Sequence, residues 1–121
     1  MRTTLFIALV MLATSARAAV VDIRWSHDRR FTHDGVIPAG KFVEICGKIP
    51  AGAKVLWEFK AGALVDFNVH YHQAKEVIYP VKLAAVATAK DILATTSEQE
   101  YCWMWSNKSD AAATLTVELA R

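Results

Sequence analysis

Residues 65–72, with the sequence VDFNVHYH, alternate strictly between apolar and polar side chains. The apolar members are Val65, Phe67, Val69 and Tyr71, and the polar members are Asp66, Asn68, His70 and His72. A period of two over eight residues is typical of an antiparallel strand with one buried face. This stretch therefore predicts a half-buried strand.

Segments of similar character lie on both sides of this stretch. They are rich in apolar, β-branched and aromatic residues, and glycine, proline or polar residues separate them. The expected strands are residues 20–25, 41–49, 54–60, 65–72, 76–82, 92–96, 101–106 and 114–119. Seven or eight short strands, with a turn signal about every ten residues, are typical of a sandwich. We therefore predict an all-β fold, an antiparallel β-sandwich.

The segments between these strands are interpreted as connections. Residues 26–40 are polar and contain glycine and proline, which predicts a long loop. Residues 83–90 are rich in alanine but short and uncapped, which predicts a loop with at most one helical turn. Residues 61–62 are expected to end a strand, and residues 107–110 to connect a hairpin. Pro80 cannot donate a ladder hydrogen bond, so it indicates an edge or a bulge.

Residues 1–18 have the features of a secretory signal peptide. Arg2 supplies a positive charge, residues 5–13 (LFIALVMLA) form an apolar run, and residues 16–18 (ARA) form a small-x-small cleavage site. The run is too short to span a bilayer, which needs about 20 apolar residues. We therefore expect an exported chain, periplasmic or secreted, with no transmembrane segment in its mature part.

The expected mature chain, residues 19–121, has the length of a single domain. It carries 12 basic and 12 acidic residues, so its formal net charge is zero. Binding of nucleic acid normally needs clustered Lys and Arg, and this sequence contains no such cluster. We therefore exclude nucleic acid as a partner.

The chain contains two cysteines, Cys46 and Cys102. In an oxidising compartment an even number of cysteines indicates disulfides, and one bridge here would enclose 57 residues. The loop-entropy model assigns such a bridge a stabilisation of about 4 kcal/mol. The alternative is a pair of separate thiols. A metal-binding or reactive thiolate has no CxxC pair or flanking histidine to support it.

Four groups of residues follow one another in an order that matches a known family. They are residues 44–46 (EIC) with 49–52 (IPAG), 55–59 (VLWEF), 65–69 (VDFNV) and 100–107 (EYCWMWSN). Over about residues 41–119 the chain thus resembles the GOLD (Golgi dynamics) domain, the lumenal β-sandwich of early-secretory cargo receptors. The resemblance implies this sandwich, a disulfide between Cys46 and Cys102, and binding of proteins or lipids.

The transport role of that family does not carry over. Cargo receptors continue into a coiled coil, a membrane span and a cytoplasmic tail, and none of these follows the last expected strand of this sequence. The leading hypothesis is therefore an exported, free-standing, non-catalytic binding or interaction module with a GOLD-like fold. It is expected to engage a protein or lipid partner in the periplasm.

The histidines support an alternative hypothesis, a periplasmic copper- or zinc-binding protein. His70 and His72 share one face of their expected strand, about 7 Å apart along the chain, so both imidazoles can approach one ion. Zn²⁺ usually needs three or four ligands, and Cu²⁺ takes a similar set of nitrogen and oxygen donors. His27 and His33, in the expected long loop, are the candidates to complete the set. The competing interpretation is that His70 and His72 are ordinary polar residues on a solvent-facing side.

Aromatic residues dominate two of the expected strands. Tyr101, Trp103 and Trp105 share one face of their expected strand. Trp57 shares one face of another expected strand with Val55 and Phe59. These residues are interpreted as core, and as a partner-binding patch if the face is exposed. Blue-copper and haem sites are excluded, because no histidine follows Cys102 and CxxCH is absent.

The sequence gives little support for catalysis. It has no GxSxG setting for a nucleophilic serine, no evident pair of acidic residues and no glycine-rich phosphate loop. We therefore predict that the protein is not an enzyme and needs no cofactor, unless the copper or zinc alternative holds.

Overall fold

The computed structural model describes residues 19–121, so the expected signal peptide lies outside the described residues. These residues form seven strands and no helix, which confirms the predicted all-β fold. The strands are β1 (Ala19–Asp22), β2 (Arg30–Ile37), β3 (Phe42–Ile49), β4 (Lys54–Gln73), β5 (Glu76–Ala94), β6 (Gln99–Ser106) and β7 (Ala113–Ala120). Two of them are long: β4 has 20 residues and β5 has 19.

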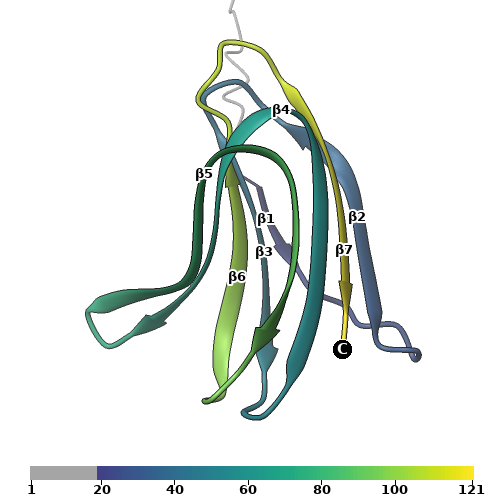
Figure 1. The fold of residues 1–121 in the computed structure, drawn as a ribbon, viewed down its shortest axis with the longest axis vertical. Helices are drawn as coiled ribbons and strands as arrows, with labels where there is room; N and C mark the ends of the chain where they lie inside the picture. The colour runs from purple at the N-terminus through teal and green to yellow at the C-terminus, as the bar shows by residue number, and fades with distance from the viewer. Residues whose placement is uncertain (1–18) are drawn as a thin grey trace, which may run out of the picture.

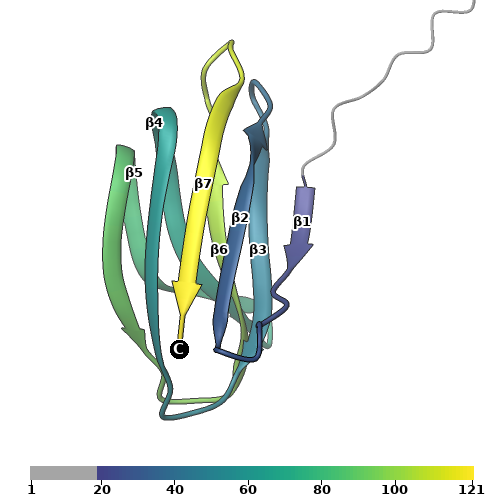
Figure 2. The same ribbon diagram turned by 90° about the vertical axis from the view of Figure 1, so that its right-hand side faces the viewer.

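The strands join into one sheet that curls on itself (Figures 1 and 2). Their order is β1-β3-β6-β4-β7-β2, and β5 pairs with β4 alone. All pairs are antiparallel except β1 with β3, which is parallel. The short β1 thus extends the sheet at the outer edge of β3, and the predicted antiparallel pattern holds for the other strands.

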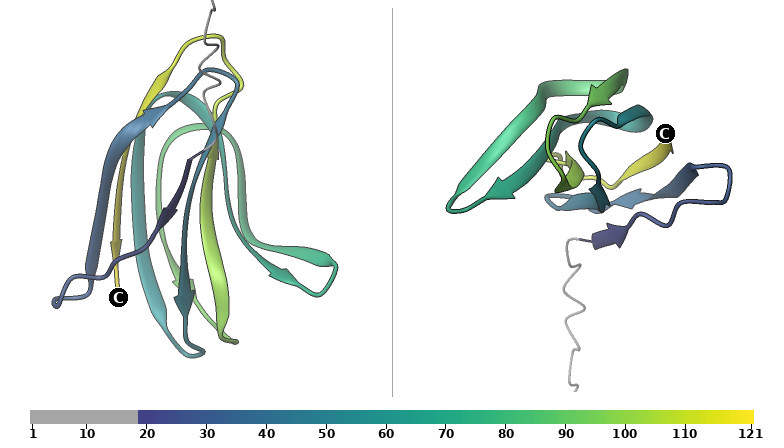
Figure 3. Two further views of the ribbon diagram at one scale, coloured as in Figure 1. Left: turned by 180° about the vertical axis from the view of Figure 1, so that it is seen from behind. Right: turned by 90° about the horizontal axis from the view of Figure 1, so that it is seen from below.

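The long hairpin of β4 and β5 creates the two halves of the curled sheet. The first arm of β4 pairs with β7 through residues 56–61, whereas its second arm pairs with β6 through residues 66–70. β5 follows β4 along both arms. Figure 1 shows the hairpin arching over, and the view from below in Figure 3 shows the strands curling around the interior of the fold. The two halves pack against each other as the layers of a sandwich do.

The arch replaces the strand end that was predicted at residues 61–62. The register of β4 against β5 shifts between Lys60 and Val65, so the strand bends there without ending. Gly62 lies so close to β7 that a Cβ would stand 2.5 Å from Oγ1 of Thr114, which explains the glycine. A small residue at this position lets the bend pack tightly against β7.

A side chain of β4 also holds the bend of β5. Ala85 has a positive φ of 51°, and its N–H donates to Oδ1 of Asp66 at 3.0 Å. Lys108 forms an ion pair with the same carboxylate at 2.7 Å, and this bond lowers the pKa of Asp66 below its ordinary value. Asp66 therefore connects the bend of β5 to the segment between β6 and β7.

The predicted loop at residues 83–90 is wrong, because this segment is part of β5. Its alanines favour a helix only weakly, and pairing with the length of β4 overrides that preference. The interpretation of Pro80 is confirmed. β5 is an edge strand, and the register shift between Val69 and Tyr71 places a bulge opposite the proline.

Two further predicted connections are wrong. The loop expected at residues 26–40 contains β2, whose Arg30 to Ile37 all pair with β7. β2 lies at an edge and leaves every second side chain exposed, so its polar composition resembles that of a loop. Residues 107–110 do not connect a hairpin, because β6 and β7 pair with different arms of β4.

The core between the two halves is centred on four aromatic rings. Phe59 and Phe67 belong to opposite arms of β4, and their ring centroids lie 4.7 Å apart. Trp57 packs on Phe67 at 4.9 Å, and Trp105 of β6 packs on Phe67 at 5.3 Å and on Phe59 at 5.6 Å. Because these rings come from both halves of the sheet, their burial holds the curl closed.

Cys46 and Cys102 form the predicted disulfide. They are direct cross-strand partners on β3 and β6, with Cα atoms 4.1 Å apart. Their neighbours in the strands, Ile45 and Trp103, are in the core. Because adjacent side chains of a strand point to opposite faces, the disulfide lies on the outer face of this half of the sheet.

Trp57→Ala is expected to lower the free energy of unfolding by about 3–5 kcal/mol, because Trp57 is only 4% exposed and its removal leaves a large cavity. Urea unfolding of the two proteins measures the difference. Leu56→Ala is the matched control, because the adjacent side chain is 52% exposed and its loss should change stability by about 0.5 kcal/mol or less. Equal effects at both positions would contradict the assigned faces.

The double variant Cys46→Ala/Cys102→Ala is expected to fold and to lose about 2–4 kcal/mol of stability, since the unfolded chain is no longer constrained by the bridge. Chemical denaturation monitored by tryptophan fluorescence tests this. Non-reducing mass spectrometry of the wild type should find the chain two hydrogens lighter than the dithiol form. An unchanged unfolding midpoint would refute the stabilising role.

Candidate functional site

His70 is buried on the outer face of the half that contains the disulfide. His70 is 5% exposed, although it belongs to the polar side of its predicted strand, where solvent exposure was one interpretation. Its Nε2 lies 2.9 Å from Oε1 of Glu44 on β3, and its Nδ1 lies 2.7 Å from Oδ1 of Asn68 on β4. The rings of His72 and Tyr79 stand 5.4 Å and 5.9 Å from its own. His70 therefore belongs to a network of polar groups from neighbouring strands.

Burial lowers the pKa of His70 below 6.5, and this effect exceeds the opposing attraction of the Glu44 carboxylate. The nearby His72 lowers the pKa of His70 further. Glu44 and Asn68 each present an acceptor oxygen to the ring, and a neutral ring has one N–H, so it donates to only one of the two oxygens. Both ring nitrogens nevertheless face protein partners.

The other histidines do not join His70 in a cluster of ligands. Residues 19–121 contain two groups of potential ligands in which all donor atoms lie within 4.8 Å of one another. Neither group includes His27, His33 or His72. His72 is exposed near the end of β4, His33 lies on β2 opposite Val117, and His27 lies in the β1–β2 connection. The copper or zinc site with these four histidines stays a prediction.

The aromatic residues that the sequence singled out lie in the core. Trp57, Tyr101, Trp103 and Trp105 are all buried. The hydroxyl of Tyr101 donates to the carbonyl oxygen of Ser97 at 2.9 Å. These residues therefore hold the two halves together, and the exposed aromatic patch that was considered for them does not form.

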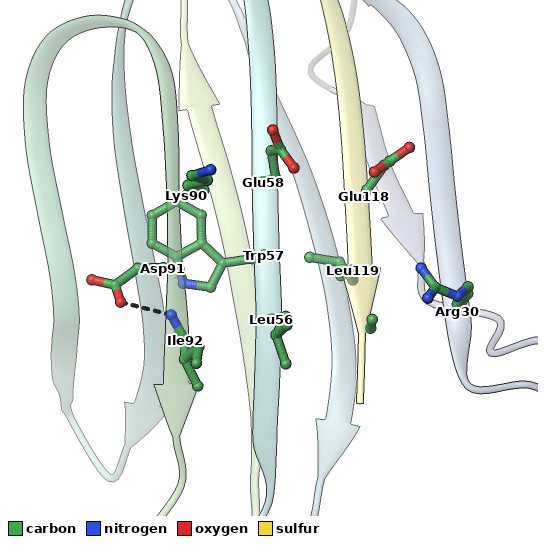
Figure 4. Close-up of a pocket in the computed structure, with 10 residues that line it drawn as sticks. Arg30, Leu56, Trp57, Glu58, Lys90, Asp91, Ile92, Glu118 and Leu119 are labelled. Atoms are coloured by element: carbon green, nitrogen blue, oxygen red, sulfur yellow. Dashed lines mark hydrogen bonds between the residues drawn. The ribbon is translucent and has the colours of Figure 1, made fainter.

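A groove lies on the outer surface of the other half of the sheet (Figure 4). It has a volume of about 270 Å³, and residues at the start of β2 and near the ends of β5 and β7 line it together with the first arm of β4. Leu56 and Ile92 are direct cross-strand partners, and they are 52% and 53% exposed. These two side chains give the groove an apolar centre on a surface that otherwise carries polar residues.

Charged side chains surround this apolar centre. Glu58 on β4 stands directly opposite Glu118 on β7 and directly opposite Lys90 on β5. Arg30 of β2 lines the groove beside β7, as Figure 4 shows. These four side chains take part in neither of the two Lys–carboxylate ion pairs of residues 19–121, nor in the contact of His70 with Glu44. Their charges are therefore available to a partner.

The local sequence patterns did not predict this groove. Leu56 and Ile92 stand at outward positions of their expected strands, and neither position alone indicates a partner, because single exposed apolar side chains are common on protein surfaces. Their neighbourhood depends on the pairing of β4 with β5 and β7, which local patterns do not specify. The same pairing brings together Glu58 and Glu118, which lie 60 positions apart in the sequence.

No helix among residues 19–121 is long and apolar enough to cross a membrane. Neither a protein-family model nor a curated protein matches the sequence. The fold, however, is similar to several solved structures.

Two of the similar structures are PliG proteins, described as periplasmic lysozyme inhibitors of g-type lysozyme. The Aeromonas hydrophila protein aligns with a TM-score of 0.59 and 11% identity over 86% of this chain and 96% of its own. The Salmonella Typhimurium protein aligns with a TM-score of 0.58 and 9% identity over 85% and 98%.

A third similar structure is the Yersinia pseudotuberculosis-derived mitogen. It aligns with a TM-score of 0.59 and 14% identity over 75% of this chain and 84% of its own. At such low identities, these likenesses show a common fold.

The stability of the protein is expected to fall as the pH drops below about 6.5, partly because of His70. Its pKa is lower in the folded chain, so the unfolded chain takes up the proton first and the folded state loses stability as the pH falls through the folded pKa. Urea unfolding between about pH 7 and 5 measures this effect.

The variant His70→Gln should show a weaker loss of stability over the same range. His27→Gln, which removes an exposed histidine from the β1–β2 connection, should behave like the wild type. A steeper loss in His70→Gln would show that protonation stabilises the folded ring, contrary to the effect of burial.

Proposed function

We propose that this chain is an exported, non-catalytic module that binds a protein partner through the groove around Leu56 and Ile92. The observation that carries the proposal is an exposed apolar centre surrounded by unpaired charges on the sheet surface. Protein interfaces have this anatomy, with an apolar centre that is desolvated on binding and a polar rim. The GOLD resemblance, which stays a prediction, is compatible with the same role.

The charges around the groove indicate what the partner offers. Glu58 and Glu118 are directly opposite each other on adjacent strands, and like charges in this arrangement destabilise a sheet. A lysine or arginine side chain of a partner would relieve the repulsion while an adjacent apolar side chain covers Leu56. We therefore infer a partner surface on which a basic residue lies next to an apolar one.

A protein is favoured over a lipid surface as the partner. Anionic membranes attract clusters of Lys and Arg, whereas Glu58, Glu118 and Asp91 line this groove alongside Lys90 and Arg30. Mixed charges at fixed positions instead favour a partner with a complementary pattern, because charge complementarity sets specificity and orientation.

The similar PliG structures support an extracytoplasmic role and suggest a first partner class. They are described as periplasmic inhibitors of g-type lysozyme, and their fold aligns with more than four fifths of this chain. A g-type lysozyme is therefore the first candidate partner, and inhibition of its activity is the function to test.

Calorimetric titration of the chain with a g-type lysozyme, together with an assay of cell-wall lysis, tests this proposal. We expect binding and inhibition in the wild type and a loss of affinity of about 30-fold or more in Leu56→Asp, because central apolar contacts dominate interface energies. The charge reversal Glu118→Lys should weaken binding as well.

The control is Leu64→Asp, which changes another exposed leucine, 65% exposed, in the arch of β4. It should bind like the wild type, and circular dichroism should report the same fold for all variants. Tight binding that Leu56→Asp leaves unchanged would refute the groove as the site. Absence of binding would refute g-type lysozyme as the partner.

A further inference from the structure

Three neighbouring strands place a row of potential metal ligands on the outer face that carries the disulfide. Cys46 of β3 pairs directly with Cys102 of β6, and Cys102 pairs directly with His70 of β4. One ring nitrogen of His70, Sγ of Cys102 and a carboxylate oxygen of Glu44 lie within 4.8 Å of one another. The two sulfurs and a carboxylate oxygen of Glu100 form a second such group. Both groups share Cys102.

We propose that reduction of the Cys46–Cys102 disulfide converts this row into a zinc site with Cys46, Cys102 and His70 as ligands. Glu100 or water supplies the fourth ligand. In the oxidised chain both sulfurs are bonded to each other, so the thiolate ligands do not exist. The site is thus available only in the reduced state.

The chemistry of the switch is thiol–disulfide exchange. A dithiol reductant transfers two electrons and two protons to the bridge, the bond between the sulfurs of Cys46 and Cys102 breaks, and the reductant becomes a disulfide. Zn²⁺ then binds the two thiolates, and their two protons pass to the solvent.

The donor types and their spacing suit Zn²⁺. Two thiolates and an imidazole form a common tetrahedral set, with Zn–S bonds of about 2.3 Å and Zn–N bonds of about 2.0–2.1 Å. Ligand atoms around such an ion lie about 3.5 Å apart. The donor atoms within each group lie within 4.8 Å of one another, and the two groups share Cys102. Closing the site therefore brings Sγ of Cys46 and a ring nitrogen of His70, which belong to different groups, to an ion beside Cys102 once the bond between the sulfurs is broken.

The strands around the row give the site its rigidity. His70 and Cys102 are 5% and 6% exposed. The side chains on the opposite face of their strands pack in the core. Glu44 contacts Nε2 of the imidazole and is placed to orient it, as carboxylates do beside metal-bound histidines, so Nδ1 is the nitrogen that exchanges its contact with Asn68 for the ion. This site differs from the one predicted from the sequence, because it uses the sulfurs and excludes His27, His33 and His72.

Titration with Co²⁺, a spectroscopic substitute for Zn²⁺, tests the proposal on the purified chain in its oxidised state and after reduction by a phosphine. We expect the reduced chain alone to develop thiolate-to-cobalt charge-transfer absorption together with the visible bands of a tetrahedral ion. Zn²⁺ should abolish both by displacement. His70→Ala should weaken binding by about 100-fold or more, since loss of an outer partner already weakens metal sites by about 10–100-fold.

His72→Ala is the matched control, because His72 lies two residues along the same strand and belongs to neither donor group. It should bind Co²⁺ like the reduced wild type. Metal binding by the oxidised chain that depends on His72 would instead favour the histidine site predicted from the sequence and overturn this proposal.

Circular dichroism shows whether the reduced chain keeps its β-sheet. The proposal is overturned by a folded, reduced chain without the charge-transfer absorption, or by absorption that His70→Ala leaves unchanged. It is equally overturned by a reduced chain that unfolds and does not regain its sheet when Zn²⁺ is added.

Discussion

The contact between Phe59 and Phe67 is the interaction on which the rest of the structure depends. Both rings come from β4, and they meet only because the strand bends between them. Once they meet, one arm of β4 accepts β7 and the other accepts β6, so a single strand belongs to both halves of the sheet. Trp57 and Trp105 complete the cluster from the two sides. Burial of these large rings favours the closed curl over a flat sheet, whose apolar face would lie in water.

The closed curl leaves two outer surfaces with different chemistry. On the half formed with β7, exposed apolar side chains stand among unpaired charges, which suits contact with another protein. On the half formed with β6, the disulfide and a buried histidine lie in one row across three strands. Neither arrangement contributes to the core, which faces the opposite side of both halves. The fold therefore determines where the groove and the row with the disulfide and His70 lie, but the core is built without them.

Both surfaces also contain groups whose placement opposes stability. Glu58 and Glu118 repel each other across β4 and β7, and burial of His70 disfavours its protonated form. Unfavourable placements of this kind gather at functional sites, where binding of a partner or an ion offsets them. The proposed protein-binding groove and the proposed redox-dependent zinc site have such placements in common, although the two lie on different halves and do not depend on each other.

The sequence by itself determined which side chains of most strands face the core. Alternation in residues 65–72 and 101–105 is a local property of the chain, and burial of Val65, Phe67, Trp103 and Trp105 follows from it. The two cysteines likewise allowed one intramolecular bridge, and the structure decided for this bridge over separate thiols. Only the tertiary structure decided the arch of β4, the inclusion of residues 30–37 and 83–90 in strands, the burial of His70 and the groove beside Leu56. Each of these depends on which strands pair and in which register, and pairing joins residues far apart in the chain, where local periodicity carries no information.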